Sequence, residues 1–166
     1  MTPPEPPALQ CPSCSSSWSE PSGRGVALGV DVSGAATALE YQLSVVVPLG
    51  WLFAIRARPV FYVGLHGAGT ALGGKIEAVF RSRPLWNFVR VYAGGGPDVF
   101  YGLTGPSARD VDGNWFAGQI DGNWFAGAEI FFDPRWSLHW ELGTSGGAFD
   151  TGAGAYADVG LLAYLF

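Results

Sequence analysis

Residues 136–143 of the 166-residue chain are Trp-Ser-Leu-His-Trp-Glu-Leu-Gly, and this stretch decides the fold class. Apolar and polar side chains alternate strictly along it, from Trp136 to Gly143. A period of two is that of a β-strand, in which successive side chains point to opposite faces of the sheet. The stretch therefore predicts a strand with one apolar face and one polar face.

The same alternation occurs in seven further segments from Arg24 onward, so the sequence predicts eight strands. These segments are residues 26–33, 40–47, 51–58, 75–81, 88–93, 124–132 and 155–166, the last blurred by Leu161-Leu162. Tight turns are expected at 48–50, 82–85 and 133–135, with mostly longer connections near 34–38, 66–73, 103–121 and 144–153. Short turns at one end and longer loops at the other indicate an up-and-down meander.

The amino-acid composition excludes several classes of protein. Hydrophobic residues make up 48% of the chain, which excludes disorder, yet no apolar run approaches the roughly 18 residues of a transmembrane helix. The length is that of one domain. Net charge is −5 and Lys75 is the single lysine, so the sequence predicts no nucleic-acid partner.

Charged residues are only 14% of the chain, against roughly 25% in an ordinary soluble domain. A soluble barrel would carry scarcely one charge per strand on its outer face. An inverted barrel resolves this, because its apolar face meets lipid and its few charges neutralise one another inside. Closure is also required there, since an open sheet edge in lipid leaves backbone groups unpaired. The alternative is a soluble lipocalin-like barrel that binds an apolar ligand.

Aromatic residues support the inverted barrel. Trp51, Trp86 and Trp136 each flank one of the tight turns, as in an aromatic girdle at a membrane interface. The chain ends in Phe166, preceded by Tyr164 and Leu162, and this ending resembles the C-terminal signal of bacterial outer-membrane barrels.

With these features, residues 24–166 resemble the eight-stranded family of the OmpA transmembrane domain and OmpX. The resemblance implies an all-β, eight-stranded antiparallel transmembrane barrel in the bacterial outer membrane. It implies contact with membrane lipid, and assembly by machinery that binds the C-terminal Phe166. We expect a monomer with a structural or surface-contact role and no open pore.

Six ionisable side chains are predicted to share one short stretch of the narrow interior: Arg56, Glu77, Arg90, Glu129, His139 and Glu141. Glu40, Arg58 and Lys75 fall on the same inward faces. Buried charges are tolerated when they are matched and hydrogen-bonded, so we expect a paired network that replaces a hydrophobic core. A proton or ion pathway is the alternative.

Ser137, His139 and Glu141 suggest a Ser/His/acid hydrolase, but residues two apart on a strand are about 7 Å apart at the backbone, too far for a relay. The lipid A deacylases, also eight-stranded, carry a His-x-Ser motif on the penultimate strand. The matching segment here is His139-Trp140-Glu141, with Glu141 at the nucleophile position. The sequence therefore predicts no catalytic residues and no enzyme, with a deacylase-like hydrolase as the alternative.

No metal or cofactor is predicted. Cys11 and Cys14 have CxxC spacing, but the sequence lacks further zinc ligands at a paired spacing. Asp110, Asp112 and Asn114 have the spacing of a calcium loop, yet Trp115 stands where that loop requires Gly.

Three features complete the expectations. Residues 1–23 are rich in Pro and Ser and match no signal peptide, so we expect a disordered arm without an export signal.

The segment Asp-Gly-Asn-Trp-Phe-Ala-Gly occurs at 112–118 and again at 121–127, and the second copy fits a strand better. Pro59 lies inside a predicted strand and is expected to require a bulge or an early loop start.

Overall fold

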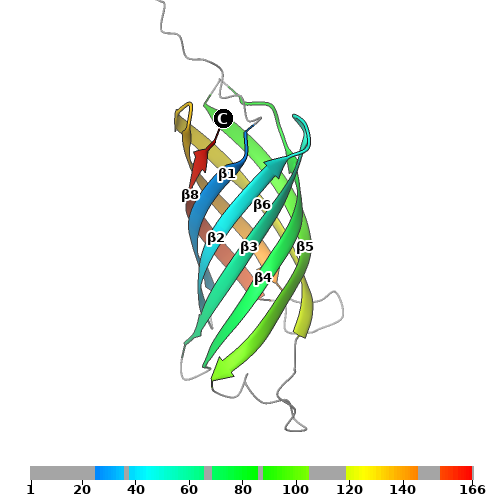
Figure 1. Ribbon diagram of the computed structural model, residues 1–166, viewed down its shortest axis with the longest axis vertical. Helices are drawn as coiled ribbons and strands as arrows, with labels where there is room; N and C mark the ends of the chain where they lie inside the picture. Colours follow the sequence, from blue (N-terminus) through cyan, green and yellow to red (C-terminus); the bar gives the residue numbers. More distant parts are fainter. Residues whose placement is uncertain are drawn as a thin grey trace, which may run out of the picture.

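The computed structural model describes residues 25–35, 38–65, 69–85, 88–104, 119–145 and 154–165. Eight strands form one closed antiparallel barrel in sequence order, with β1 paired to β8 (Figure 1). They are β1 (Ala27–Ala35), β2 (Ala38–Pro48), β3 (Phe53–Gly64), β4 (Thr70–Arg81), β5 (Val89–Thr104), β6 (Gln119–Asp133), β7 (Trp136–Ser145) and β8 (Gly154–Tyr164). The predicted eight-stranded meander is confirmed. The predicted arm at 1–23 lies outside the described residues.

The three predicted tight turns, which follow β2, β4 and β6, lie together at the end of the barrel where β1 begins and β8 ends (Figure 1). At the other end, β1 and β2 are joined by residues 36–37 alone, so that connection is shorter than the expected 34–38. The turn after β2 closes with a hydrogen bond from the Leu49 amide to the Phe53 carbonyl, 2.9 Å. Gly50 has φ +140° there, a backbone conformation that favours glycine. In the turn after β6, the Asp133 side chain accepts a hydrogen bond from the Arg135 amide.

Several strands are longer than the alternation predicted. β4 begins at Thr70 instead of residue 75, β5 continues to Thr104 instead of 93, and β6 begins at Gln119 instead of 124. Glycines at 73–74 and 94–96 interrupt the hydrophobic pattern there but not the register between β4 and β5. A Cβ placed on Gly94 would lie 2.3 Å from the Ala78 carbonyl oxygen. These glycines therefore allow neighbouring backbones to approach closely.

The expectation of a bulge or early loop start at Pro59 was wrong. Pro59 pairs with Gly74 in β4, and the register between β2 and β3 is the same on both sides of it, at Gln42–Val60 and Val45–Ala57. Its ring is exposed on the outside of the barrel. The closed sheet thus tolerates one missing amide donor without changing register, because the neighbouring pairs hold the strand in place.

The side chains are distributed as the inverted barrel predicts, with apolar residues on the outside and charged residues in the interior. The outer wall is apolar: Leu43, Ile76 and Leu142 are each more than half exposed. The interior holds the buried charges, including Arg58, Lys75 and Glu77. This arrangement is the reverse of a soluble lipocalin-like barrel and contradicts that alternative. Across the described part of the chain, no helix is both long and apolar enough to cross a membrane.

Candidate functional site in the barrel interior

The centre of the interior is occupied by ion pairs between opposite walls. We call Arg56, Arg58, Glu77 and Glu141 the central cluster. Arg56 on β3 donates from both terminal nitrogens to Glu141 on β7, at 2.8 and 2.7 Å, and from Nε to Glu77 on β4, at 2.6 Å. All three side chains are buried. Such two-point pairs combine strength with fixed geometry.

Arg58 is the second cation of the central cluster. It donates to Glu77 and lies 3.2 Å from Glu141 and 3.3 Å from Asp158. The Asn123 amide donates to the Glu77 carboxylate at 2.5 Å. The Arg56 guanidinium also stacks on the ring of Phe125, 4.3 Å from its centroid. The central cluster therefore links β3, β4, β6, β7 and β8 through mutually bonded buried groups.

A cluster nearer the longer loops surrounds the single lysine. Lys75 Nζ lies 2.7 Å from Glu40 and 3.8 Å from Asp98, and it faces the ring of Tyr156. The Tyr62 hydroxyl donates to Asp98 at 3.0 Å. These contacts join β2, β3, β4, β5 and β8, so this loop-side cluster also spans the interior.

A third cluster lies nearer the tight turns. Glu129 accepts hydrogen bonds from Ser137, at 2.5 Å, and from the Tyr164 hydroxyl, and it pairs with Arg90 at 3.4 Å. Arg90 lies over the ring of Phe131. Glu129 thus holds β5, β7 and β8 together at the turn-side end of the interior.

The six residues predicted to form one network are all buried in the interior. The structure brings Arg56, Glu77 and Glu141 into direct contact, with His139 3.9 Å from Glu141. Arg90 and Glu129 instead pair with each other in the turn-side cluster. The expected single network is therefore divided along the barrel axis.

Three further inward carboxylates, Asp31, Asp98 and Asp158, are not among the predicted interior charges. Asp31 lay on the correctly predicted polar face of its segment but was not counted as a charge. Asp98 follows the glycines that hid the second half of β5, and Asp158 lies where Leu161-Leu162 blurs the alternation. Only the first of the three had a usable signal.

The three residues of the hydrolase alternative form no Ser–His hydrogen bond in this structure. Ser137 donates to Glu129, away from His139. All of Ser137, His139 and Glu141 are buried inside the barrel. They therefore face away from the outer wall, where a lipid substrate would lie.

Comparison with known proteins identifies the fold. No family model and no curated protein sequence matches the chain. Among solved structures, the N-terminal β-barrel domain of Pseudomonas aeruginosa OprF superposes with a TM-score of 0.68 at 14% identity, covering 86% of this chain and 98% of that one. A de novo designed transmembrane β-barrel superposes with a TM-score of 0.59 at 10% identity, covering 86% and 96%. The chain has the fold of an eight-stranded transmembrane β-barrel.

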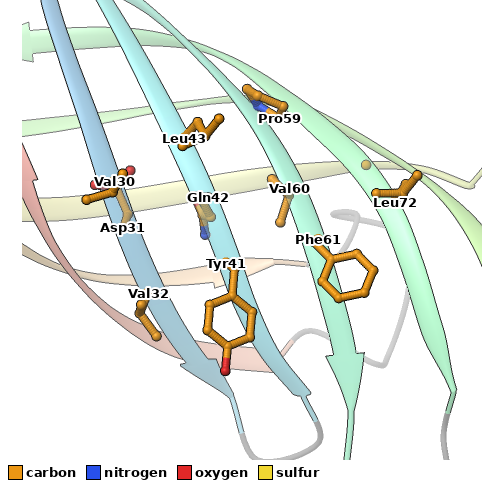
Figure 2. A pocket seen from close by; sticks show the side chains of 11 residues that line it. Val30, Asp31, Val32, Tyr41, Gln42, Leu43, Pro59, Val60, Phe61 and Leu72 are labelled. Carbon is orange, nitrogen blue, oxygen red and sulfur yellow. The ribbon is translucent and has the colours of Figure 1, made fainter.

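The outer wall of this transmembrane barrel is apolar and carries hollows between its side chains. Figure 2 shows one shallow apolar hollow on it, where Val32, Tyr41, Leu43, Phe61 and Leu72 point outward from β1 to β4. Inward residues such as Gln42 lie behind the wall in the same view.

The predicted girdle and assembly residues are only partly described. Trp51 and Trp136 lie at the tight-turn end of the transmembrane barrel and are exposed, and Arg83 stacks on Trp51. Leu162 and Tyr164 point into the interior. Trp86 and Phe166 lie outside the described residues, as do the first copy of the repeat and the candidate calcium loop. The second copy lies in β6, with Trp124 exposed on the outer wall.

Proposed function

We propose that the protein is an integral barrel of the bacterial outer membrane, with a structural or surface-contact role and a lumen closed by side chains. The observation that carries this proposal is the two-point pair between Arg56 and Glu141, which bridges opposite walls at the centre of the interior. Eight strands enclose an interior just wide enough for side chains, and this pair occupies it. The barrel has no catalytic role in this proposal.

The proposed orientation places the tight turns in the periplasm and the longer connections at the cell surface, as is usual for barrels of this kind. The connection at 105–118 contains Trp115 and Phe116, which suit contact with a partner at the surface. We propose that the barrel functions as a monomer surrounded by lipid, and that the assembly machinery binds its C-terminal segment through Phe166.

Conductance tests the closed lumen. The full chain is reconstituted into planar lipid bilayers, with a porin as the positive control. We expect negligible steady conductance, because the central cluster excludes a continuous water column. Reproducible open channels of porin size would contradict the closed lumen.

Cysteine labelling in intact bacterial cells tests location and orientation. In a Cys11→Ser/Cys14→Ser background, Thr104→Cys at the loop end should react with a membrane-impermeant maleimide. Arg135→Cys at the tight-turn end should react only after the outer membrane is permeabilised. The opposite pattern would invert the orientation, and no labelling of either variant before lysis would contradict a surface-exposed barrel.

A further inference from the structure

Three buried side chains on neighbouring strands converge beside the central cluster. Asp31 on β1 and His139 on β7 are both paired across the sheet with Gly160 on β8, and Asp158 lies two residues before it. One atom of each residue that could bind a metal, a carboxylate oxygen or an imidazole nitrogen, lies within 4.8 Å of the corresponding atoms of the other two. They are 2%, 1% and 3% exposed, respectively.

Glycine at position 160 makes this convergence possible. A Cβ there would lie 1.9 Å from Asp31 Oδ1 and 2.5 Å from His139 Cε1. Any larger residue would separate the two side chains. The sequence therefore leaves an opening on the inner face of β8 that the carboxylate and the imidazole share.

The free atoms of these side chains point toward one another. Asp31 holds a hydrogen bond from Ser44 through Oδ2, and Asp158 is paired with Arg58 through Oδ2. Within the described chain, the remaining oxygen of each carboxylate and both ring nitrogens of His139 have no hydrogen-bond partner. Buried polar atoms without a protein partner are uncommon, and a bound ion or water is one group that satisfies them.

The charges nearby indicate the sign of that ligand. The central cluster contributes two guanidinium groups and two carboxylates, so its charges balance. Asp31 and Asp158 then add two negative charges, and among the described residues the further ion-pair contact of each is with His139, which is a cation only when protonated. A divalent cation bound by a neutral imidazole would remove this excess.

The spacing suits a small transition-metal ion. His139 Nε2 lies 3.3 Å from Asp31 Oδ1 and 3.7 Å from Asp158 Oδ1. Ligand bonds of about 2.0 to 2.1 Å in a tetrahedron place ligand atoms roughly 3.3 Å apart. Imidazole nitrogen with carboxylate oxygen is a common donor set for zinc and its neighbours.

We propose that Asp31, His139 and Asp158 bind one divalent transition-metal ion, represented by Zn²⁺, inside the barrel. Ser44 and Arg58 hold the two carboxylates in position by their second oxygens, as supporting residues do at metal sites. The ion ties β1, β7 and β8 together at the seam where the first and last strands close the barrel. This site is independent of whether the lumen conducts.

Zinc content after refolding tests the site. The full chain with Cys11→Ser and Cys14→Ser is unfolded in urea, refolded into detergent micelles with ZnCl₂, desalted and analysed by elemental mass spectrometry. The two serines remove zinc binding by the CxxC segment. We expect about one zinc per folded chain, and a higher melting temperature than after refolding with chelator, because the ion binds the folded state.

Matched variants locate the ion. Asp31→Asn and His139→Gln should each reduce the zinc content at least tenfold and abolish the rise in melting temperature. Glu129→Gln, a buried substitution in the turn-side cluster, should leave both unchanged. If one variant fails to fold, Asp158→Asn provides the same test.

X-ray absorption on the zinc-loaded wild-type chain gives a readout that requires no variant. We expect a first shell of nitrogen and oxygen at about 2.0 to 2.1 Å without sulfur. A sulfur shell would assign the zinc to Cys11 and Cys14 and overturn the site. Folded protein without zinc, or zinc content that the variants do not change, would equally overturn it.

Discussion

Arg56 and Glu141 are 85 residues apart in sequence and form a two-point ion pair across the barrel, with nitrogen–oxygen distances of 2.8 and 2.7 Å. Both side chains are buried, with 4% and 1% of their surface exposed. Each charge is therefore stabilised by its partners and by little else. The stability of the barrel should depend on keeping both members of the pair or removing both.

Removing one residue of the pair leaves the other charge buried without its ion-pair partner. We expect Arg56→Ala or Glu141→Ala to lower the free energy of unfolding in detergent by about 3 to 5 kcal/mol. The double variant should lose less than the sum of the two single losses, because it strands neither charge. Urea titrations followed by tryptophan fluorescence measure all three values.

Arg83→Ala is the control for this cycle, since Arg83 is exposed and stacks on Trp51. Its loss should be about 1 kcal/mol or less. Small and additive losses for Arg56 and Glu141 would mean that these side chains are solvated.

The contribution of the Tyr164 hydroxyl can be measured apart from that of its aromatic ring. It donates to the buried Glu129 carboxylate, so Tyr164→Phe should cost about 1.5 to 3 kcal/mol of unfolding free energy, the range for hydrogen bonds to charged groups. The aromatic ring of the proposed assembly signal is kept, so the amount of barrel assembled in cells should stay near the wild-type level. Tyr41→Phe, at an exposed position on the outer wall, should change neither quantity. A large fall in assembly with unchanged stability would show that the hydroxyl serves recognition instead.

Gly96 is required for the close approach of two strands. A Cβ there would lie 1.9 Å from the Ile76 carbonyl oxygen and 2.9 Å from the Glu77 Cα, both backbone atoms that cannot turn away. We expect Gly96→Ala to destabilise the barrel by about 1 to 3 kcal/mol. Gly122→Ala in β6 is the matched control, because its Cβ would meet no atom within 4 Å. Equal effects of the two substitutions in the same urea titrations would refute the packing argument.

The outer face of β7 should contact lipid. Spin labels on cysteines at Leu138, Trp140 and Leu142 should be relaxed strongly by oxygen and weakly by a water-soluble nickel chelate. A label at Arg135, in the turn, should show the reverse, and Ser137→Cys in the interior should be shielded from both reagents. Relaxation by the nickel chelate at all three outer positions would contradict a membrane-embedded wall.

Much of the fold could be predicted from local pattern. The stretch from Trp136 to Gly143 predicted a strand, its period of two and the face to which each side chain points, and the structure confirms all three. The errors fall where glycine or proline interrupts the pattern, as at Gly94–Gly96 and Pro59. There the pairing with two neighbouring strands, which a local pattern does not contain, sets the strand length and register.

The sequence by itself determined which face is charged in the segments whose alternation is uninterrupted, because alternation depends only on neighbouring residues. The facing of Arg56, Glu77 and Glu141 was therefore predictable. Tertiary structure alone decided which charges meet, since contacts across the interior depend on how far each strand is staggered when the barrel closes. That stagger brings Arg56 to Glu141 and leaves Arg90 with Glu129. It also brings Asp31 from β1 and His139 from β7 close to Asp158 beside Gly160 on β8, although Asp31 lies more than a hundred residues before the other two in the sequence.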